Sequence, residues 1–356
     1  MDPALSNLPP IVFALAPELS TIPLGPEPLA TCHDCAMQPR PGADQGRPVF
    51  TAAARCCTFQ PHLSNHIVGR ILLRGGPGAE RLRLRLQQPE GIDPLGVRGS
   101  AGWIARYQAS LEHGFGCDAS LTCPYWVEGE LSCSIHPDRE AICRTWHCRL
   151  ERGVMAQRVW SALREVLQCI EHTLAHAAMR AGDPPPPLTP PSEAPPDEVP
   201  PPSEAPPSAE VWIAWFEACA QHVDGLTSGE LEALRGRRLQ AALSALRLRV
   251  DERDAPMPNV LMPAVRNWSV QPHGVVLIGW SSYDPVVAPP HVFQLLSRLD
   301  GHTPWRRALA SAEAALEHPI GDDLVLQLYR RGLLTRPEHT EVGEGLTVIP
   351  RLSRGP

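Results

Sequence analysis

The stretch CRTWHCRLERGVMAQRVWSALREVLQCIEHTL, residues 143–174, decides how this chain of 356 residues is organised. It begins with Cys143 and Cys148 and continues into the longest helical pattern of the sequence. Seven apolar residues recur there at helical spacing: Val154, Trp160, Leu163, Val166, Leu167, Ile170 and Leu174. This spacing predicts an amphipathic helix of about 25 residues that closes a cysteine-rich domain. A shorter helix is predicted over residues 101–112 on the same grounds.

Cysteines are concentrated before this helix. The chain has 11 cysteines, and nine of them lie within residues 32–148. In a reducing compartment such clusters are more often metal ligands or redox groups than disulfides. Cys169 and Cys219 lie outside the cluster in helical patterns, so we expect both to be small core residues.

The spacing of the clustered cysteines predicts a metal centre. Cys32 and Cys35 form a C-x2-C pair, two further cysteines are adjacent, and Cys143 and Cys148 form a C-x4-C pair. Zinc sites and iron–sulfur clusters both need about four convergent thiolates, and the spacing leaves the choice between them open. The predicted ligands are Cys32, Cys35, Cys56, Cys57, Cys123, Cys133, Cys143 and Cys148. Five histidines near these motifs are candidates of lower rank: His33, His62, His66, His136 and His147.

The order of the cysteine boxes resembles the YkgJ-type cysteine-cluster family, which is described as a zinc- or iron-chelating domain. The matching boxes are the upstream cysteines at 32, 35, 56 and 57, then CPYW at 123–126, CSI at 133–135 and REAICR at 139–144. Glu140 stands where the family has proline, and 20 residues separate Cys35 from Cys56 where the family has two or three. The resemblance covers about a third of the chain and implies metal chelation by these cysteines.

Composition divides the chain into five segments. Residues 184–207 contain 13 prolines in 24 positions, which is typical of an extended spacer that cannot form a core. The predicted segments are an N-terminal extended arm (1–31), a cysteine-cluster metal-binding domain (32–182), a Pro-rich linker (183–208), an antiparallel helical hairpin (209–252) and a C-terminal domain (253–356). The predicted fold class is α+β and mainly helical.

The C-terminal segment is predicted to be a winged helix. Short strands are expected at 260–265 and 275–278, helices at 291–299, 305–316 and 322–334, and a last strand at 346–349. Its Leu299-Asp300-Gly301-His302-Thr303 motif resembles the winged-helix proteins similar to PqqD, a protein of pyrroloquinoline-quinone synthesis. That resemblance implies an exposed strand edge that accepts a peptide. The nearby segment WSSYDP, residues 280–285, is interpreted as a turn with buried aromatics or the wall of a pocket.

Charge and composition exclude several functions. All 32 basic residues are arginines, so no lysine is present for a Schiff base or a Walker A loop. The net charge is −7, and residues 256–350 carry seven arginines against nine acidic residues, which disfavours nucleic-acid binding. No apolar run approaches the ~18 residues of a membrane span, and the first residues are a poor secretion signal. We therefore expect a cytoplasmic protein with neither a nucleic-acid nor a membrane partner.

These observations favour a metal-binding accessory protein. It would carry an iron–sulfur cluster or zinc and recognise a peptide or protein through its C-terminal module, serving peptide modification or electron transfer. One alternative is a zinc-stabilised scaffold or adaptor without catalysis. Another is a metal-dependent modifying enzyme related to flagellin lysine-N-methylases. Whether the chain is an enzyme stays open at this point.

Overall fold

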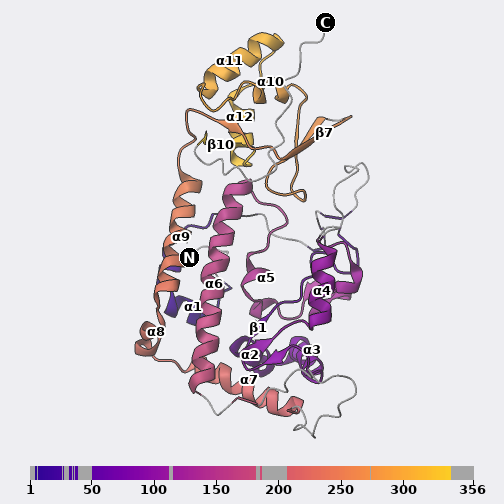
Figure 1. The fold of residues 1–356 in the computed structure, drawn as a ribbon, viewed down its shortest axis with the longest axis vertical. Helices are drawn as coiled ribbons and strands as arrows, with labels where there is room; N and C mark the ends of the chain where they lie inside the picture. The colour runs from indigo at the N-terminus through magenta and orange to yellow at the C-terminus, as the bar shows by residue number, and fades with distance from the viewer. Residues whose placement is uncertain are drawn as a thin grey trace, which may run out of the picture.

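A long central helix organises the computed structural model. The structure describes residues 5, 7–25, 27, 32–33, 35, 37–38, 50–111, 115–181, 185–186, 207–272 and 274–337. Helix α6 (Gly153–Ala181) and helix α9 (Arg237–Asp254) run side by side along the long axis of the molecule (Figure 1). Helix α7 (Ala209–Asp224) lies at one end of α6, and the C-terminal module lies at the other.

The N-terminal part has an apolar core and is built from short elements. These elements are α1 (Pro10–Leu15), the 3-10 helix η2 (Pro17–Thr21), β1 (Leu63–Ser64), α2 (Asn65–Arg74), α3 (Gly76–Leu86), β2 (Ile92–Asp93), β3 (Gly96–Val97) and α4 (Ala101–Ser110). The three strands pair antiparallel in the order β1-β3-β2. The helix predicted over 101–112 is α4, and the side chain of Ser100 caps it by accepting from the Trp103 amide.

The cysteine boxes lie in short, irregular elements that end at α6. These are the 3-10 helix η3 (Ala119–Leu121), β4 (Trp126–Val127), the 3-10 helix η4 (Glu128–Glu130), β5 (Ser132–Cys133), the 3-10 helix η5 (His136–Asp138) and α5 (Ala141–Thr145). Strand β4 pairs antiparallel with β5, which places Cys133 opposite Trp126. The predicted closing helix is confirmed as α6, which has 29 residues.

The segments 209–252 and 1–31 share one core with the cysteine-rich part. Helix α7 packs on α2, α3 and α6, and α9 packs on α6, so these helices mainly contact the cysteine-rich part rather than each other. The second expected helix is interrupted near Gly236 and forms α8 (Ser228–Leu234) and α9. The N-terminal arm does pack on this core, but residues 10–21 are helical rather than extended, with proline at the first helical positions.

The C-terminal module has a separate core. It contains β6 (Met262–Pro263), β7 (Asn267–Gln271), β8 (Gly274–Ile278), β9 (Val286–Ala288), α10 (Val292–Leu296), α11 (Trp305–Leu316), α12 (Asp322–Arg330) and β10 (Leu334–Thr335). The order β7-β8-β9 places β8 at the centre of a three-stranded antiparallel sheet. The predicted last helix ends four residues early, because residues 331–335 turn and pair with β6. The strand predicted at 346–349, and most of the predicted linker at 183–208, lie outside the described residues.

The architecture is therefore mainly helical with small sheets, as the predicted α+β class requires. Within the described ranges, no helix combines the length and the apolar character that a membrane span needs. The Asp300 carboxylate accepts hydrogen bonds from the amides of His302 and Thr303, so the Asp-Gly-His-Thr motif forms the turn before α11.

The contact between α2 and α7 leads to a stability prediction. A Cβ atom added at Gly69 in α2 would lie 1.8 Å from the Phe216 carbonyl oxygen of α7. We expect Gly69→Ala to lower the free energy of unfolding by about 1–3 kcal/mol or more, because the helices must separate. The matched control is Gly102→Ala in α4, where a Cβ meets no atom within 4 Å. That change should leave stability equal or raise it by about 0.4–1 kcal/mol. Urea unfolding of both variants checks this, and equal stabilities would contradict the packing.

Candidate metal centre

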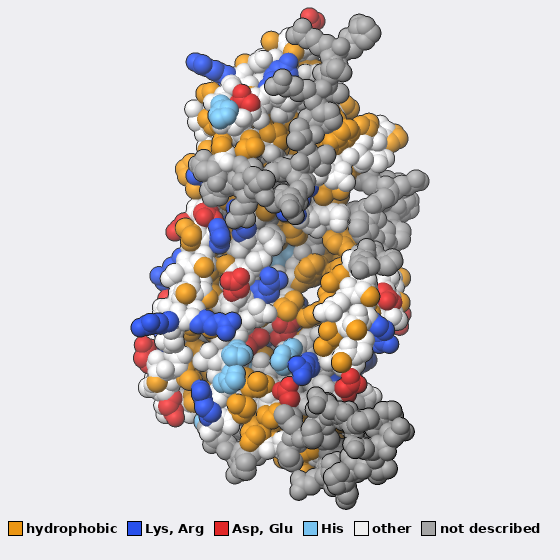
Figure 2. All heavy atoms as spheres, in the orientation of Figure 1, with side chains coloured by type: hydrophobic (Ala, Val, Ile, Leu, Met, Phe, Trp, Pro, Cys, Tyr) orange, Lys and Arg blue, Asp and Glu red, His pale blue; other side chains and the backbone are white. Residues whose placement is uncertain are grey.

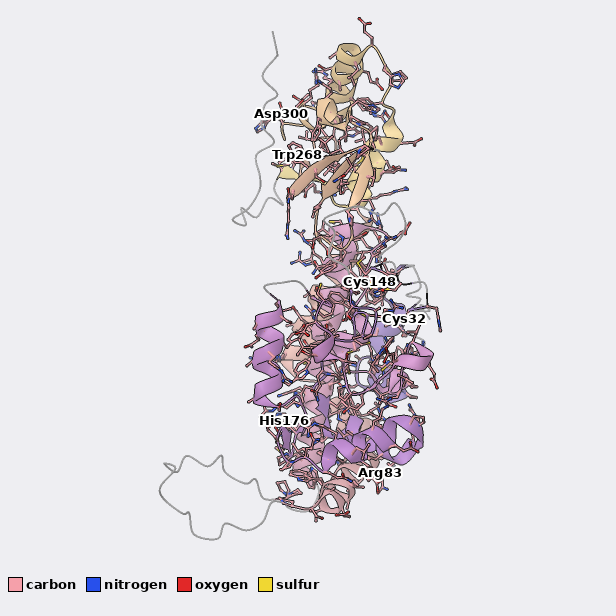
Figure 3. All side chains as sticks on the ribbon, turned by 90° about the vertical axis from the view of Figure 1, so that its right-hand side faces the viewer. Cys32, Arg83, Cys148, His176, Trp268 and Asp300 are labelled. Carbon is pink, nitrogen blue, oxygen red and sulfur yellow. The ribbon has the colours of Figure 1, made fainter. Side chains whose placement is uncertain are left out.

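The predicted ligands come from six separated segments of the chain. Two lie after the N-terminal arm, two in the turn at residues 51–58, and the others after η3, in β5, in α5 and immediately before α6. In this order they are Cys32 and Cys35, Cys56 and Cys57, Cys123, Cys133, Cys143 and Cys148. In Figure 3 the labelled Cys32 and Cys148 lie close to the level where the C-terminal module meets the rest of the molecule, away from Arg83 and His176.

Five of these thiols form a first group. The thiol of Cys56 hydrogen-bonds with those of Cys148 and Cys57. The bond to Cys56, together with burial, raises the pKa of the Cys148 thiol. The bond from Cys148 lowers the pKa of Cys56, but the bond to Cys57 and burial outweigh it, so this pKa also rises well above its usual value. Burial and the charges of Cys35 and Cys148 raise the pKa of Cys32.

The other three thiols form a second group. Burial raises the pKa of Cys123 to about 12, and Cys133 adds to the shift. Burial also raises the pKa of Cys133. The pKa of Cys143 is raised by burial and then by Glu140, to which its thiol hydrogen-bonds. Raised pKa values keep these thiols protonated at neutral pH in the absence of a bound cation.

The two groups are neighbours. Cys32 and Cys133 interact electrostatically, and the amide of Cys123 donates a 2.7 Å hydrogen bond to the carbonyl oxygen of Cys57. Over the described residues, however, no group of three or more His, Cys, Asp or Glu side chains is arranged so that it could hold a metal ion. The thiols are thus brought to one region without adopting the geometry of a ligand shell, and the predicted metal centre stays a prediction.

Arginines surround the thiols. Those that lower a thiol pKa are Arg55, Arg81, Arg139 and Arg149. Arg55 and Arg139 both act on Cys32, and they therefore favour its charged thiolate form. Four thiolates around a divalent ion leave a charge of about −2, which such arginines offset. The positive field fits thiolate ligation better than a set of inert buried thiols.

Unpartnered polar atoms lie on residues adjacent to the cysteines. Arg55 Nε, Thr58 Oγ1 and His147 Nε2 are buried and have no hydrogen-bond partner in the described part of the chain. Arg55 also has a positive φ of 57°, which is uncommon for a residue with a side chain and marks sites under local constraint. Buried donors and acceptors normally have partners. The sulfur atoms of a metal centre would accept hydrogen bonds from such groups. The unpartnered atoms therefore fit a bound metal–sulfur centre.

Glu140, which stands where the YkgJ-type pattern has proline, has a local structural role. Its carboxylate accepts hydrogen bonds of 2.6 Å and 2.8 Å from the amides of Ile142 and Cys143, so it caps α5. A proline at this position could not accept these bonds. Glutamate here orients Cys143 through the backbone of its own helix. Arg144, in the same helix, donates to the carbonyl oxygens of Asn7, Pro137 and Arg139.

The candidate histidines have different surroundings. His147 packs against Trp160 with ring centroids 4.3 Å apart, and burial lowers its pKa to about 4. His62 interacts with Asp93 and Arg98. His66 is 2% exposed in a cavity of about 30 Å³ beneath α1, and its Nδ1 has no partner among the described residues. His147 is adjacent in sequence to Cys148 and packs on α6, while His66 belongs to a different cavity.

Sequence reasoning missed the aromatic wall of the site. Phe50 packs with Cys35, Met37, Cys56, Cys148, Phe115 and Tyr283 in a small apolar cluster. Phe50 is 5.7 Å from Phe115 and 5.3 Å from Tyr283 between ring centroids. The pocket-wall interpretation of the segment at 280–285 was the one sequence signal for it. Cys169 and Cys219, by contrast, are buried in the main core, as predicted.

Comparison with known proteins adds no relative. No family model, no curated protein and no solved structure matches this chain. The resemblances to the YkgJ-type and PqqD-like families therefore stay predictions that the cysteine boxes and the order of the C-terminal elements support.

Burial of His66 leads to a prediction of pH dependence. Burial, with a smaller effect of Arg70, lowers the pKa of His66 to about 3 from the usual 6.5. The folded state favours the neutral imidazole of His66. The stabilisation of the folded state by this neutral ring is complete above pH 6.5, and it falls by about 1.4 kcal/mol per pH unit as the pH drops toward 3. His66→Gln should remove this part of the acid sensitivity, whereas the same change at the partly exposed His176 should not. Unfolding free energies measured between pH 7 and 4 check this. An unchanged pH dependence in His66→Gln would contradict it.

Proposed function

We propose that this protein binds a metal through cysteine thiolates and acts as an accessory protein whose C-terminal module recognises a peptide or another protein. One observation carries the proposal. Thiols from six separated segments lie in one region, and Arg55, Thr58 and His147, which carry buried unpartnered atoms, are adjacent in sequence to three of the cysteines. A purely apolar packing of thiols gives no reason to bury those polar groups, because each costs free energy without a partner.

The first thiol group supplies the better ligand set. Cys32, Cys35, Cys56 and Cys148 are mutual neighbours that include one C-x2-C pair, and Cys57 is an additional donor. The second group, with three thiols, would complete a centre or support a second one. An iron–sulfur cluster bound there would carry electrons, whereas zinc would hold the loops together. The chain itself supplies soft ligands, nearby arginines and the apolar wall formed by Phe50 and Phe115.

The C-terminal sheet supports peptide recognition. Strand β7 pairs with β8 along one side, and no other described strand pairs with its outer edge. Val270 in β7 is 64% exposed. An extended peptide can add to such an edge through main-chain hydrogen bonds. On the face drawn in Figure 2, acidic and basic side chains are interspersed rather than gathered into a basic patch, which favours a peptide over a nucleic acid.

The two alternatives make different demands on the same residues. A zinc scaffold needs a closed set of four ligands and loses only stability when one is replaced. A modifying enzyme related to the lysine-N-methylases needs, in addition, a site for a methyl donor. The cavities of about 50 Å³ beside α12 and about 30 Å³ beneath α1 are each too small for such a cofactor and give this alternative no support. We favour the accessory protein.

Anaerobic purification followed by metal and sulfide analysis tests the proposal. We expect bound iron with sulfide, or zinc, at about one or more ions per chain. Cys56→Ser should lose most of this metal, because Cys56 contacts two other thiols of the first group. Cys117→Ser is the matched control, because Cys117 is exposed and outside the predicted set. Metal-free wild-type protein, or equal metal content in the two variants, would refute the metal centre. Zinc in place of iron would exclude the electron-transfer role.

A further inference from the structure

The C-terminal module contributes a wall to the thiol region. The ring of Tyr283 belongs to the small cluster that contains Cys35, Cys56 and Cys148. Its hydroxyl donates a 2.9 Å hydrogen bond to the carbonyl oxygen of Phe115. A residue 168 positions away in the sequence is thus held at the rim of the thiol cluster. Tyr283 thus packs against a cluster in which Cys35 is buried and Cys56 and Cys148 are partly exposed.

The next residue anchors the module to the segment that carries Cys148. The Asp284 carboxylate is 3% exposed. It accepts a 3.2 Å hydrogen bond from the Leu150 amide and a 3.0 Å bond from Trp280 Nε1, and it pairs with the Arg331 guanidinium. Arg331 in turn donates a 2.6 Å bond to the Leu150 carbonyl oxygen. Both main-chain groups of Leu150, two residues after Cys148, are therefore held by the module.

Close backbone packing fixes the same contact. A Cβ atom at Gly153 would lie 2.0 Å from the Arg331 carbonyl oxygen, and one at Gly332 would lie 2.3 Å from Val154. Both glycines have positive φ values, 52° and 69°. The start of α6 and the turn after α12 thus meet at backbone distance, which only glycine permits.

The contact can open without unfolding either part. The module has its own apolar core, separate from the core that contains α6 and α9. The connection between them is the short segment that follows α9. The contact between them is polar at Asp284 and Arg331 and apolar at Trp280 and Tyr283, and two bodies with separate cores and one connecting segment can separate as units.

From these contacts we propose that the Trp280–Asp284 loop is a gate over the thiols of Cys35, Cys56 and Cys148, and that docking of the C-terminal module controls how fast external reagents reach them. In the docked arrangement, Tyr283 covers the cluster and Asp284 holds the Cys148 segment. When the module separates, the three thiols open to solvent together. The gate concerns access to the metal-free thiols, so its test does not depend on whether the protein binds a metal.

Pulsed alkylation of the reduced, metal-free full chain tests the gate. Iodoacetamide is the probe, and mass spectrometry gives a rate for each cysteine. Two variants open the contact in different ways: Tyr283→Ala removes the cover, and Asp284→Arg places a positive charge against Arg331. We expect the rates of Cys35, Cys56 and Cys148 to rise at least about tenfold in both variants, because a thiol reacts only when reagent can reach it.

Other positions supply the controls. Cys169 and Cys219 are buried in the main core, and their rates should stay unchanged. Asp322→Arg is the matched control for charge, because Asp322 pairs with Arg306 at an exposed position of the module. The Leu150 amide donates a hydrogen bond to Asp284, so its hydrogen exchange should accelerate in Asp284→Arg. Faster exchange at this amide reports release of the module directly.

Two results would overturn the gate. Unchanged rates of Cys35, Cys56 and Cys148 in both variants would show that the loop does not limit access. A parallel rise at Cys169 and Cys219 would show that the loop supports the whole fold instead of covering one site. A rise confined to the three thiols, accompanied by faster exchange at Leu150, supports the gate whether or not the purified protein contains metal.

Discussion

The burial of one face of α6 is the constraint on which the other features depend. Val159, Leu163, Val166 and Ile170 are each at most 2% exposed and recur every three or four residues. That stripe packs against α2, α7 and α9, so the helix reaches from the thiol region to the far end of the molecule. Its first residue, Gly153, meets the C-terminal module at backbone distance. The position of α6 therefore sets where the Cys148 segment and the module can meet.

Around the start of this helix, the chain buries polar groups that a simple core would exclude. Thiols with raised pKa values, arginines and unpartnered donors share a small region with Phe50 and Phe115. Each such group costs free energy when it is buried alone. A ligand that draws on the thiols offsets that cost, which connects the proposed metal centre to the local constraint at Arg55. The module closes the same region from outside, so the two proposals concern adjacent parts of one site.

Particular elements show which features could be predicted. Helix α6 was predicted because its apolar period is long and regular. Helix α2 was not predicted, although Ile67, Val68, Ile71 and Leu72 recur at helical spacing, because this pattern extends over only ten residues. The cluster of cysteines was predicted from spacing, and their proximity follows from the fold. Their arrangement in two groups could not be predicted, because it depends on how β5 and α5 pack.

The sequence alone determined the local features: the long helix, the cap at Ser100, the turn at Asp300 and the cysteine pairs, because each depends on residues a few positions apart. Tertiary structure alone decided that residues 209–252 share the main core and that α1 covers His66. It also decided that Asp284 and Arg331 hold Leu150. These contacts join residues far apart in the sequence, up to 181 positions for Leu150 and Arg331, and no periodicity or spacing encodes such pairs. Their energy arises only when burial brings the two segments together and removes water from both.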